Sequence, residues 1–496
     1  MLLDALALPA DRILRADVCV IGGGPAGITA ARRLAERKLS VCLLESGGFE
    51  REPETQALAA GRTDGNVPRL TPAYLTDTRP RYFGGASNAW AGQCRPLDAV
   101  DFVARDWIPH SGWPFERGEL DPYYRQAADV LGLNADGFLD GKAPVPADGG
   151  QRLFTAANPT VVAKGFQYAA LRFGLEFRQE LVDSEAIQLV LHGTVVALET
   201  NRAGTAVQRA RVASASGRGL AVEARWFVLA AGGIENARLL LLSDGTQRAG
   251  LGNGNDLVGR YFMEHPHVYD GLGLVAVWRQ ALGRLYLPGV ATMFFTAEPL
   301  MRAERLTHLA LNLVEARTPA LGEADRGLVM AAEDFDMGPR DSGVVRPPSL
   351  RQLNVQAEQV PNPASRVTLT SAQDALGARR VNLDWRLAPP DLSSVYRFVH
   401  VLCRELAKEG VGRGRVAAAE ADLPSLVAWG AHHIGTTRMH ADPKHGVVDA
   451  DARVHGVANL FVAGCSVFPT SGAANPTFTV LALALRLADR IGVLGG

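Results

Sequence analysis

The chain has little cysteine and no long uninterrupted apolar run. Its 496 residues include five cysteines, and no two of these form a Cys-x-x-Cys motif. An odd number without metal-ligand spacing predicts reduced thiols in a cytoplasmic protein, with neither a disulfide framework nor a metal site. No uncharged apolar segment approaches the roughly 20 residues that a membrane-spanning helix needs. The cysteines are Cys19, Cys42, Cys94, Cys403 and Cys465.

Net charge is also nearly absent. Lysine and arginine number 51 against 52 aspartates and glutamates, and the formal charge is -1. This balance argues against nucleic acid or an anionic membrane surface as a partner. The first six residues lack the basic and apolar regions of a signal peptide, although export as the passenger of a signal-bearing partner stays open. At roughly 150 residues per domain, the length predicts two to four structural units.

Glycine, by contrast, is abundant, and its first cluster forms a nucleotide-binding pattern. The strand-like run 17–21 leads into G-x-G-x-x-G at Gly22, Gly24 and Gly27, and a helical pattern and a second strand-like run follow. Glu45 closes the second run, near the distance expected for a carboxylate that binds ribose hydroxyls. The glycines let a pyrophosphate approach the helix N-terminus. The motif leaves NAD and FAD open, and Ser46-Gly47-Gly48 after the acid favours FAD.

The middle of the chain suggests a return to the same sheet. Residues 81–92 set small residues around Trp90, which is typical of backbone packed against a flat ligand or of a loop packed under that ring. Period-two alternation predicts a β-meander over 194–200, 207–213 and 220–224. A buried strand at 226–230 then runs into glycines and a helix at 235–242. This second strand–glycine–helix unit predicts that the chain rejoins the nucleotide-binding sheet.

Residues from about 270 to 430 predict a separate substrate domain. Alternation over 352–360, 366–370 and 380–385 indicates an antiparallel sheet, and 393–408 indicates an amphipathic helix. Asn354, Gln356 and Glu358 share one strand face, so they either line a polar pocket or face solvent. The segment 332–348 is interpreted as a lid. The stretch Tyr261–His267 carries two histidines and a glutamate without a third metal ligand at useful spacing, which favours a structural or domain-joining role.

The C-terminal region holds the candidate chemistry. His432 lies in Ala-His-His-Ile-Gly-Thr-Thr-Arg-Met, and Asn475 lies in Gly-Ala-Ala-Asn-Pro-Thr. Histidine is a base near neutral pH without large perturbation, and an asparagine side chain both donates and accepts hydrogen bonds. Asn475 is also a good helix N-cap, and Pro476 is a good first residue for the predicted helix 477–490. The positive end of that helix would stabilise negative charge.

These motifs together resemble the glucose–methanol–choline (GMC) oxidoreductase family. The matching stretches are 22–27 with Glu45, 84–90, 229–235 and nearly all of 432–491. The patterns His-x-x-Gly-Thr-x-Arg-Met at 432–439 and Gly-Ala-x-Asn-Pro-Thr at 472–477 are most similar to the branch containing pyranose 2-oxidase and bacterial sugar and glycoside oxidases. Residues 130–190 and 270–350 match poorly, and substrate choice is expected to reside there.

The resemblance implies an α/β fold, α+β overall. A Rossmann-like FAD-binding domain with a β-meander insertion is expected over 1–130, 180–268 and 446–496. A substrate-binding domain, built on an antiparallel sheet with helices, is expected over 131–179 and 269–445. The flavin-contacting loop would lie at 81–95, within the first part of the FAD-binding domain.

The resemblance also assigns roles to residues. His432 would be the catalytic base and Asn475 its partner. Apart from the resemblance, His433 as the neighbour of that base, and Gln356 and Glu358 on their strand face, are candidates for substrate binding. Family members that bond the flavin covalently do so through a histidine before the Trp; Ala89 stands there, so FAD is expected to bind non-covalently. The implied FAD contacts are Gly22, Gly24, Gly27, Glu45, Gly85, Ser87, Asn88, Val196, Gly464, Cys465, Pro476 and Thr477.

The expected reaction is the oxidation of a secondary or primary CH–OH group of a sugar or glycoside, with hydride transfer to flavin N5. A dehydrogenase for another alcohol, such as an aminoglycoside precursor, a polyol or an aromatic alcohol, is the alternative. A flavin with a structural role or in an electron-transfer subunit is a third possibility. Ala91 departs from the hydroxyl residue that some members place near the flavin, which leaves oxygen, a quinone and a partner protein open as electron acceptors.

Overall fold

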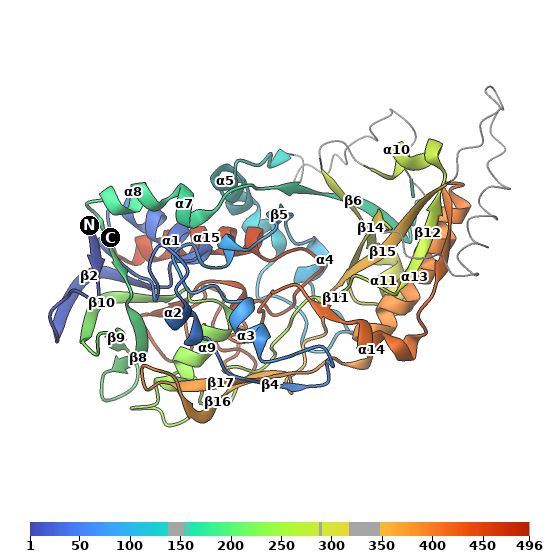
Figure 1. The fold of residues 1–496 in the computed structure, drawn as a ribbon. Helices are drawn as coiled ribbons and strands as arrows, with labels where there is room; N and C mark the ends of the chain where they lie inside the picture. The colour runs from blue at the N-terminus through green and yellow to red at the C-terminus, as the bar shows by residue number, and fades with distance from the viewer. Residues whose placement is uncertain (137–152, 155–156, 287–289, 317–347, 496) are drawn as a thin grey trace.

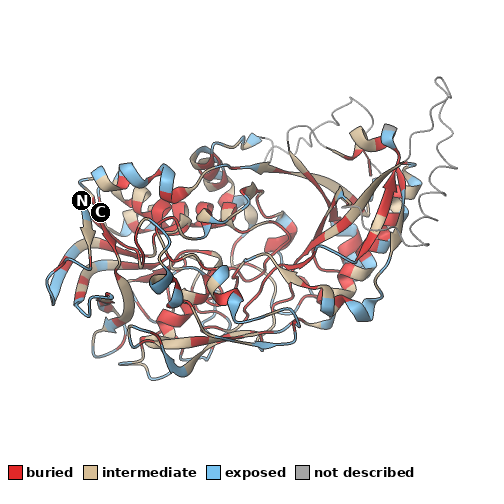
Figure 2. Ribbon diagram, in the orientation of Figure 1, coloured by how far each residue is buried: buried red, intermediate tan, exposed pale blue. Residues whose placement is uncertain are grey.

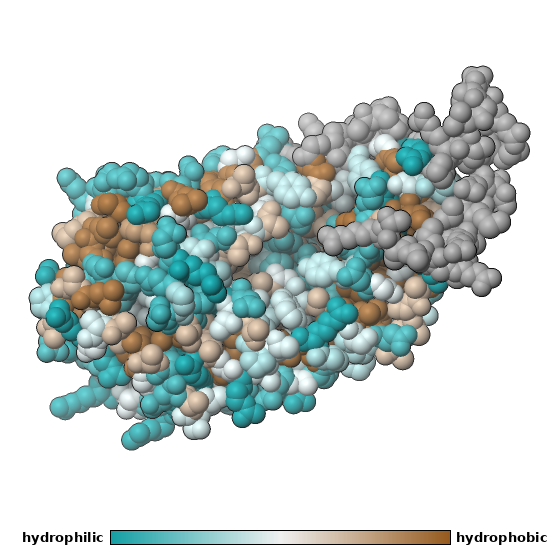
Figure 3. Space-filling model, in the orientation of Figure 1, coloured by the Kyte–Doolittle hydropathy of each residue, from teal (hydrophilic) through white to brown (hydrophobic). Residues whose placement is uncertain are grey.

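The computed structural model describes residues 1–136, 153–154, 157–286, 290–316 and 348–495. The molecule is elongated, and both chain termini lie at the same end (Figure 1). Buried residues follow the strands of each sheet and the helix faces packed on them (Figure 2). On the face shown in Figure 3, hydrophobic side chains form scattered groups between hydrophilic ones. Among the described residues, no helix is both long and apolar enough to cross a membrane.

An eight-stranded sheet lies at the end that carries the termini, in the order β1-β7-β3-β2-β10-β9-β8 with β20 beside β10. All its pairs are parallel except those of the meander strands β8 and β9. Val18, Cys19 and Val20 are fully buried, as expected of a parallel strand covered on both faces. The strands are β1 (Leu2–Asp4), β2 (Arg12–Ile21), β3 (Val41–Leu44), β7 (Ile187–Leu191), β8 (Thr194–Thr200), β9 (Val207–Ala213), β10 (Gly219–Leu229) and β20 (Leu460–Val462).

Helices from both ends of the chain cover this sheet. The first helix, α1 (Pro25–Glu36), packs against the last, α15 (Thr477–Gly495), and α15 also packs on α5 (Asp121–Leu131). Arg33 on α1 pairs with Asp489 on α15 at 2.6 Å. The second strand–glycine–helix unit is β10 followed by α9 (Gly233–Leu242). Because β10 pairs with both β2 and β20, the chain does return to the nucleotide-type sheet, as predicted.

A nine-stranded sheet, entirely antiparallel, forms the other part of the molecule. Its main order is β18-β12-β15-β14-β13-β6-β5, and β11 joins β15 to β19. The amphipathic helix α13 (Pro389–Lys408) packs its apolar face on β18, β15 and β14. The strands are β5 (Gln93–Cys94), β6 (Val161–Tyr168), β11 (Pro266–Val268), β12 (Gly273–Val277), β13 (Ala291–Thr296), β14 (Leu309–Glu315), β15 (Ser349–Ala357), β18 (Gly412–Val416) and β19 (Ala428–Trp429).

A third, three-stranded sheet corrects one expectation. The strands predicted at 366–370 and 380–385 do form, as β16 (Arg366–Gln373) and β17 (Arg379–Trp385), but they do not join the large antiparallel sheet. They pair with each other, and β17 also pairs in parallel with β4 (Arg62–Gly65). The reason is apolar packing, because Val367, Val381 and Leu383 share a core cluster with Ile234 of α9.

The mixed α/β fold predicted from the sequence is confirmed, whereas the domain boundaries remain a prediction. Most of the proposed lid, 332–348, lies outside the described residues. The remaining helical elements are short: α2 (Pro53–Ala57), α3 (Ala73–Asp77), η1 (Gly85–Asn88), α4 (Ala99–Phe102), η2 (Arg117–Leu120), α7 (Phe173–Glu176), α8 (Arg178–Asp183), η3 (Arg279–Ala281), α10 (Leu282–Leu285), α11 (Glu298–Glu304), η4 (Glu420–Asp422), α14 (Leu423–Leu426) and η5 (Cys465–Val467).

Candidate active site

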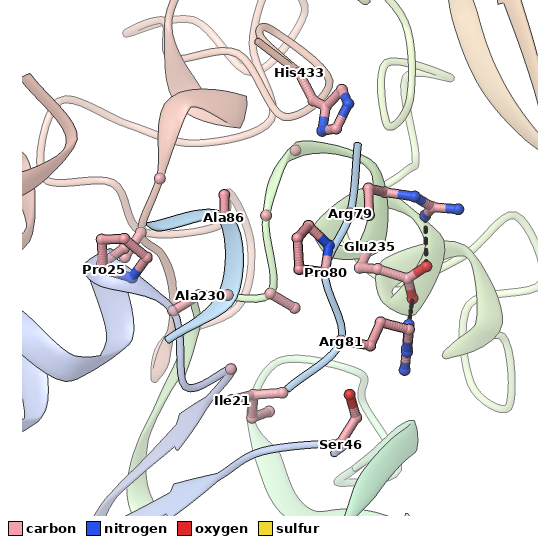
Figure 4. Close-up of a pocket in the computed structure, with 18 of the residues that line it drawn as sticks. Ile21, Pro25, Ser46, Arg79, Pro80, Arg81, Ala86, Ala230, Glu235 and His433 are labelled. Carbon is pink, nitrogen blue, oxygen red and sulfur yellow. Dashed lines mark hydrogen bonds and ion pairs between the residues drawn. The ribbon is translucent and has the colours of Figure 1, made fainter. Parts of the chain in front are cut away.

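A first cavity opens at the carboxyl ends of β2, β3 and β10, the place where parallel α/β sheets bind ligands (Figure 4). It encloses about 1330 Å³ of empty space, its open mouth included. Most of the cofactor contacts predicted from the sequence line it. These are Gly22, Glu45, Gly85, Gly464, Cys465, Pro476 and Thr477.

The glycine loop before α1 is shaped for close backbone contact. Gly22 has φ of +115°, and a Cβ atom there would lie 2.5 Å from the carbonyl oxygen of Ala230. A Cβ atom on Gly27 would overlap the carbonyl oxygen of Gly22. Gly24 differs, because the nearest atom to its Cβ position is Gly85 Cα at 3.9 Å. Gly24 is the N-cap of α1 without a side-chain cap, so the first N–H groups of that helix remain able to bind an anion.

Glu45 is held in place by the same loop. Its carboxylate accepts hydrogen bonds from the N–H groups of Gly23 and Gly47, each at 2.9 Å. The residue is 5% exposed, and it lines the cavity at the end of β3. The hydroxyl of Ser46 also donates to it, at 3.1 Å. A carboxylate has about four acceptor positions, so about one remains for a ribose hydroxyl of a dinucleotide.

A group of charged residues that the sequence did not single out forms another part of the wall. Arg79 and Arg81 both pair with Glu235, at 2.7 and 3.4 Å (Figure 4). Burial lowers the pKa of Arg79 to about 10, while the neighbouring guanidinium groups lower the pKa of Glu235 to about 2 against the effect of its burial. Arg81 Nε is buried and has no hydrogen-bond partner among the described residues. Arg238 pairs with Glu235 as well as with Asp374, so this group holds three cations and two anions. Its excess positive charge and the unused donor of Arg81 suit an anionic ligand such as a diphosphate.

Five predicted cofactor residues do not line this cavity: Gly24, Gly27, Ser87, Asn88 and Val196. Gly27 is nevertheless required by the geometry of the loop, because a Cβ atom there would overlap a backbone oxygen, whereas Gly24 has room for one. Ser87 Oγ donates to Gly84 O at 2.7 Å and accepts from the N–H of Phe173, and Asn88 donates to Phe83 O, so both side chains shape η1.

Val196, also outside the lining, is the extra residue at a register shift between β8 and β9. It lies directly after the lining residues Thr194 and Val195. An extra residue in one strand leaves its backbone groups without a ladder partner. The prediction that Val196 contacts the cofactor remains a prediction.

A second cavity, of about 1380 Å³ with its open mouth, adjoins the first. The antiparallel sheet supplies one side of it through Met293, Asn312, Asn354, Val355 and Gln356. Trp90, with Ala89 and Ala91 on either side, lies in the lining as well. The residues that line both cavities mark where the two meet. They are Thr78, Pro80, Ala86, Ala431, His432 and Thr477.

His432 stands at this junction because its backbone is fixed by Glu264. The N–H of Gly430 donates to Glu264 Oε2 at 2.7 Å, and the N–H of His432 donates to Oε1. The intervening Ala431 adopts the left-handed conformation with φ of +60°. Tyr74 also donates to Glu264. Burial raises the pKa of Glu264 to about 8 in spite of these donors, which favour the charged carboxylate.

The ring of His432 is partly exposed and contacts a second histidine. Its Nδ1 lies 2.8 Å from Nδ1 of His265, and Nε2 of His265 lies 2.8 Å from the carbonyl oxygen of Gly472. The ring of His267 lies 6.1 Å from that of His432. Burial and the neighbouring imidazoles lower the pKa of His432 well below its usual value, so the ring is neutral near pH 7. The segment expected to be structural therefore touches the candidate base through Glu264 and His265.

His433 has different surroundings, although it is the next residue. It lines only the first cavity, where its Nε2 lies 3.0 Å from Thr78 Oγ1 and its ring packs edge-on against Tyr74. Burial and the nearby Arg79 lower its pKa to about 3. The structure thus separates the two histidines: His432 faces both cavities, and His433 faces the cofactor cavity rather than the one expected for substrate.

Asn475 lines the second cavity, and Gln356 positions it. Gln356 Nε2 donates to Asn475 Oδ1 at 3.0 Å and to the carbonyl oxygen of Ala473 at 2.9 Å. With the amide oxygen bonded to Gln356, the Nδ2 group of Asn475 remains as the donor for a ligand in the cavity. Gln356 lines the same cavity, so the structure brings Asn475, Gln356 and His432 together there, while their roles remain a prediction.

Glu358 is placed elsewhere, which corrects its candidacy for substrate binding. It follows β15 and pairs with Arg105 across the two parts of the molecule, with both side chains fully buried. The period-two pattern predicted one face, but the strand ends at Ala357.

Asp98, Asp101 and His308 form a second charged group, near Arg105 and Glu358. One carboxylate oxygen or ring nitrogen of each residue lies within 4.8 Å of those of the other two, as in a possible metal site. Lys164 and Arg95 pair with Asp98 at 2.6 and 3.0 Å and supply positive charge there. These paired charges therefore join the two parts of the molecule.

Comparison with known proteins agrees with this geometry. Residues 17–249 match the family profile "FAD dependent oxidoreductase", and residues 361–484 match "GMC oxidoreductase". A crystal structure of formate oxidase superposes with a TM-score of 0.62 at 18% identity, covering 98% of this chain and 99% of that one. At that identity, the likeness concerns the fold alone.

Curated relatives align over nearly the whole chain. The 6'''-hydroxyparomomycin C oxidase of Streptomyces lividus is 28% identical over 97% of this chain and 92% of its own length. The fructose dehydrogenase large subunit of Gluconobacter japonicus is 25% identical over 97% and 98%, and the C-glycoside 3-oxidase of Microbacterium trichothecenolyticum is 24% identical over 96% of both chains. The chain belongs to the GMC oxidoreductase family and is an FAD-dependent oxidoreductase that acts on CH–OH groups.

Proposed function

We propose that the protein oxidises a CH–OH group of a sugar or glycoside to a carbonyl, with His432 as the base. The observation that carries this proposal is the position of His432 where the cofactor and substrate cavities meet. A base there reaches a hydroxyl group in the second cavity while the carbon that bears it faces the first. Asn475 supports the assignment, because it lines the second cavity with an amide donor available.

Oxidation of an alcohol removes a proton from oxygen and a hydride from carbon. The neutral His432 accepts the hydroxyl proton, and a positioned base typically contributes about 10²–10⁴-fold to such a step. The Nδ2 group of Asn475 donates to the same oxygen and stabilises the negative charge that develops there. Bound FAD supplies the acceptor for the hydride. Of the two hydrogens removed, one goes to His432 as a proton and the other goes to the flavin as a hydride, which leaves the carbonyl product.

The substrate class follows from the lining of the second cavity. Five amide side chains line it, and an amide group can donate and accept hydrogen bonds, which matches a ligand rich in hydroxyl groups. Asn475 keeps its donor and Gln356 its acceptor for such a ligand, because the other end of each is already bonded. Trp90 and Tyr269 add aromatic surface for the apolar face of a sugar ring. Two relatives are named for a sugar and for glycosides, in keeping with this assignment. The amides are Gln93, Asn312, Asn354, Gln356 and Asn475.

An amino sugar is the second candidate, favoured by one residue. Asp77 is exposed and belongs to the lining of the second cavity, and no lysine or arginine does among the described residues. A single carboxylate favours a substrate with an ammonium group by direct charge pairing. The relative from Streptomyces lividus is named for the oxidation of a paromomycin, in keeping with this second candidate.

The residues of the first cavity fit FAD. Three features suit a dinucleotide diphosphate. A side chain on Gly22 or Gly27 would overlap the backbone, the N-terminus of α1 is open, and Arg81 has an unused donor. Ala89 has no nucleophilic atom, which supports non-covalent binding. Oxygen, a quinone and a partner protein stay open as acceptors of the electrons.

Anaerobic mixing of the FAD-loaded protein with candidate alcohols tests the function. Neutral sugars and glycosides, amino sugars, polyols and aromatic alcohols are each added, and loss of the flavin absorbance is followed. Bleaching by sugars or glycosides supports the main proposal, bleaching only by amino sugars supports the second, and no bleaching by either class refutes both. The variant His432→Ala is expected to keep FAD but lose bleaching. His455→Ala is the matched control, since His455 lines neither cavity.

A further inference from the structure

One side chain, His265, bridges the two segments that carry the candidate catalytic residues. Its Nδ1 contacts Nδ1 of His432 at 2.8 Å, and its Nε2 contacts the carbonyl oxygen of Gly472 at 2.8 Å. Gly472 begins the short segment that ends at Asn475. His265 is fully buried, and the main chain beside it is fixed by two hydrogen bonds of 2.9 Å between Met263 and Ile434. The ring of His265 therefore has little freedom to move.

These contacts determine where the protons are. A carbonyl oxygen only accepts, so Nε2 of His265 carries a proton and donates it to Gly472. Burial lowers the pKa of His265 to about 4, and the ring is therefore neutral near pH 7 with an unprotonated Nδ1. Nδ1 of His432 must then carry a proton and donate it to His265, since two lone pairs 2.8 Å apart would repel each other. Nε2 of His432 is left with its lone pair free.

We propose that His265 is a positioning residue that holds His432 in the tautomer whose Nε2 accepts the substrate proton. The inference rests on the proposed function of His432 as the base. A neutral partner has a distinct consequence here. A carboxylate at the same place would favour the charged imidazolium and raise the pKa of His432, whereas a neutral imidazole orients the ring and leaves the base unprotonated. The bond to Gly472 also keeps the Asn475 segment in register with His432.

Two substitutions separate positioning from simple packing. His265→Leu fills similar space but offers neither donor nor acceptor, and His265→Gln keeps one of each. At metal sites, loss of an outer residue that orients a ligating histidine typically costs about 10–100-fold, and we expect a similar range for an orienting partner of a histidine base. We expect His265→Leu to lower the limiting rate of flavin reduction by this factor, with FAD content unchanged, and His265→Gln to recover part of the loss. His455→Leu is the control, because His455 Nε2 also contacts a backbone carbonyl, that of His440, at 2.9 Å.

The tautomer itself is measured by NMR on the FAD-loaded protein with nitrogen-15 in its histidines. The His432 signals are those lost in His432→Gln. We expect a protonated Nδ1 and an unprotonated Nε2 in the wild type and in His265→Gln, and mixed tautomers in His265→Leu. A wild-type His432 protonated on Nε2 refutes the proposal, as does an unchanged pattern in His265→Leu. This measurement needs no turnover, so an enzyme that no alcohol reduces would refute the function of the site without deciding the role of His265.

Discussion

Reduction of the flavin by an alcohol is expected to stay near its maximal rate when the pH falls from about 7 to about 5.5. The cause is the pKa of His432, which burial and the imidazoles of His265, His267 and His433 hold well below 6.5. His432 accepts a proton only in its neutral form. A lowered pKa keeps it in that form at lower pH, so the rate should be insensitive to acid in this range.

The size of the expected difference follows from ordinary histidine titration. A histidine with the usual pKa of about 6.5 is neutral in about one molecule in eleven at pH 5.5, so a base of that kind would lose roughly tenfold in rate. His265 and His433, whose pKa values are lowered by burial to about 4 and about 3, stay neutral at the same pH. No positive charge therefore arises beside His432. We expect a change in rate below about twofold.

Stopped-flow mixing under anaerobic conditions measures this rate directly. The enzyme is kept near pH 7 and is jumped to each lower pH together with a saturating neutral sugar, so that neither prolonged acid exposure nor a titrating substrate contributes. Burial raises the pKa of Glu264 to about 8, above the pH range measured. The flavin bound before and after mixing is the control. A rate that falls about tenfold along a single titration centred near 6.5 would refute the reasoning.

Three further predictions concern the cofactor and the core. Gly27→Ala should abolish FAD binding because its methyl group overlaps a backbone oxygen, whereas Gly24→Ala, with 3.9 Å available, should still fold; flavin absorbance per protein distinguishes them. Glu358→Gln breaks a buried ion pair and should lower the free energy of unfolding by about 3–5 kcal/mol. Glu304→Gln, at an exposed pair, should cost about 0–1 kcal/mol in the same urea titration. Because Ala89 offers no bonding atom, unfolding should release all the yellow colour through a filter, and colour retained with the protein contradicts this.

Much of the cofactor-binding part could be predicted because its signals are local. The strand, the glycines, the helix and Glu45 follow one another in the sequence, and a helix begins directly after Pro476. Each of these features depends on backbone conformation over a few residues, which the residue types themselves determine. The meander strands β8 and β9 were predicted with the bounds observed, since their alternation is regular and their turns contain glycine.

The contacts around the base could not be predicted in the same way. Glu264 and His265 act on His432 from more than 160 residues away in the sequence, and nothing near either residue indicates the pairing. Glu358 shows the opposite failure. Its alternation with Gln356 suggested a shared face, but the strand ends between them, and a buried cation determines where its carboxylate points.

The distribution of the parallel sheet along the chain has a consequence for synthesis. Its central strands β2 and β10 are complete by residue 229, yet β20, which pairs with β10, and α15, which packs on α1, begin only at residues 460 and 477. Domains generally fold as units while they emerge from the ribosome. This one cannot complete its cofactor cavity until the final helix has left the exit tunnel. A nascent chain that stops short of α15 is therefore not expected to hold the cofactor.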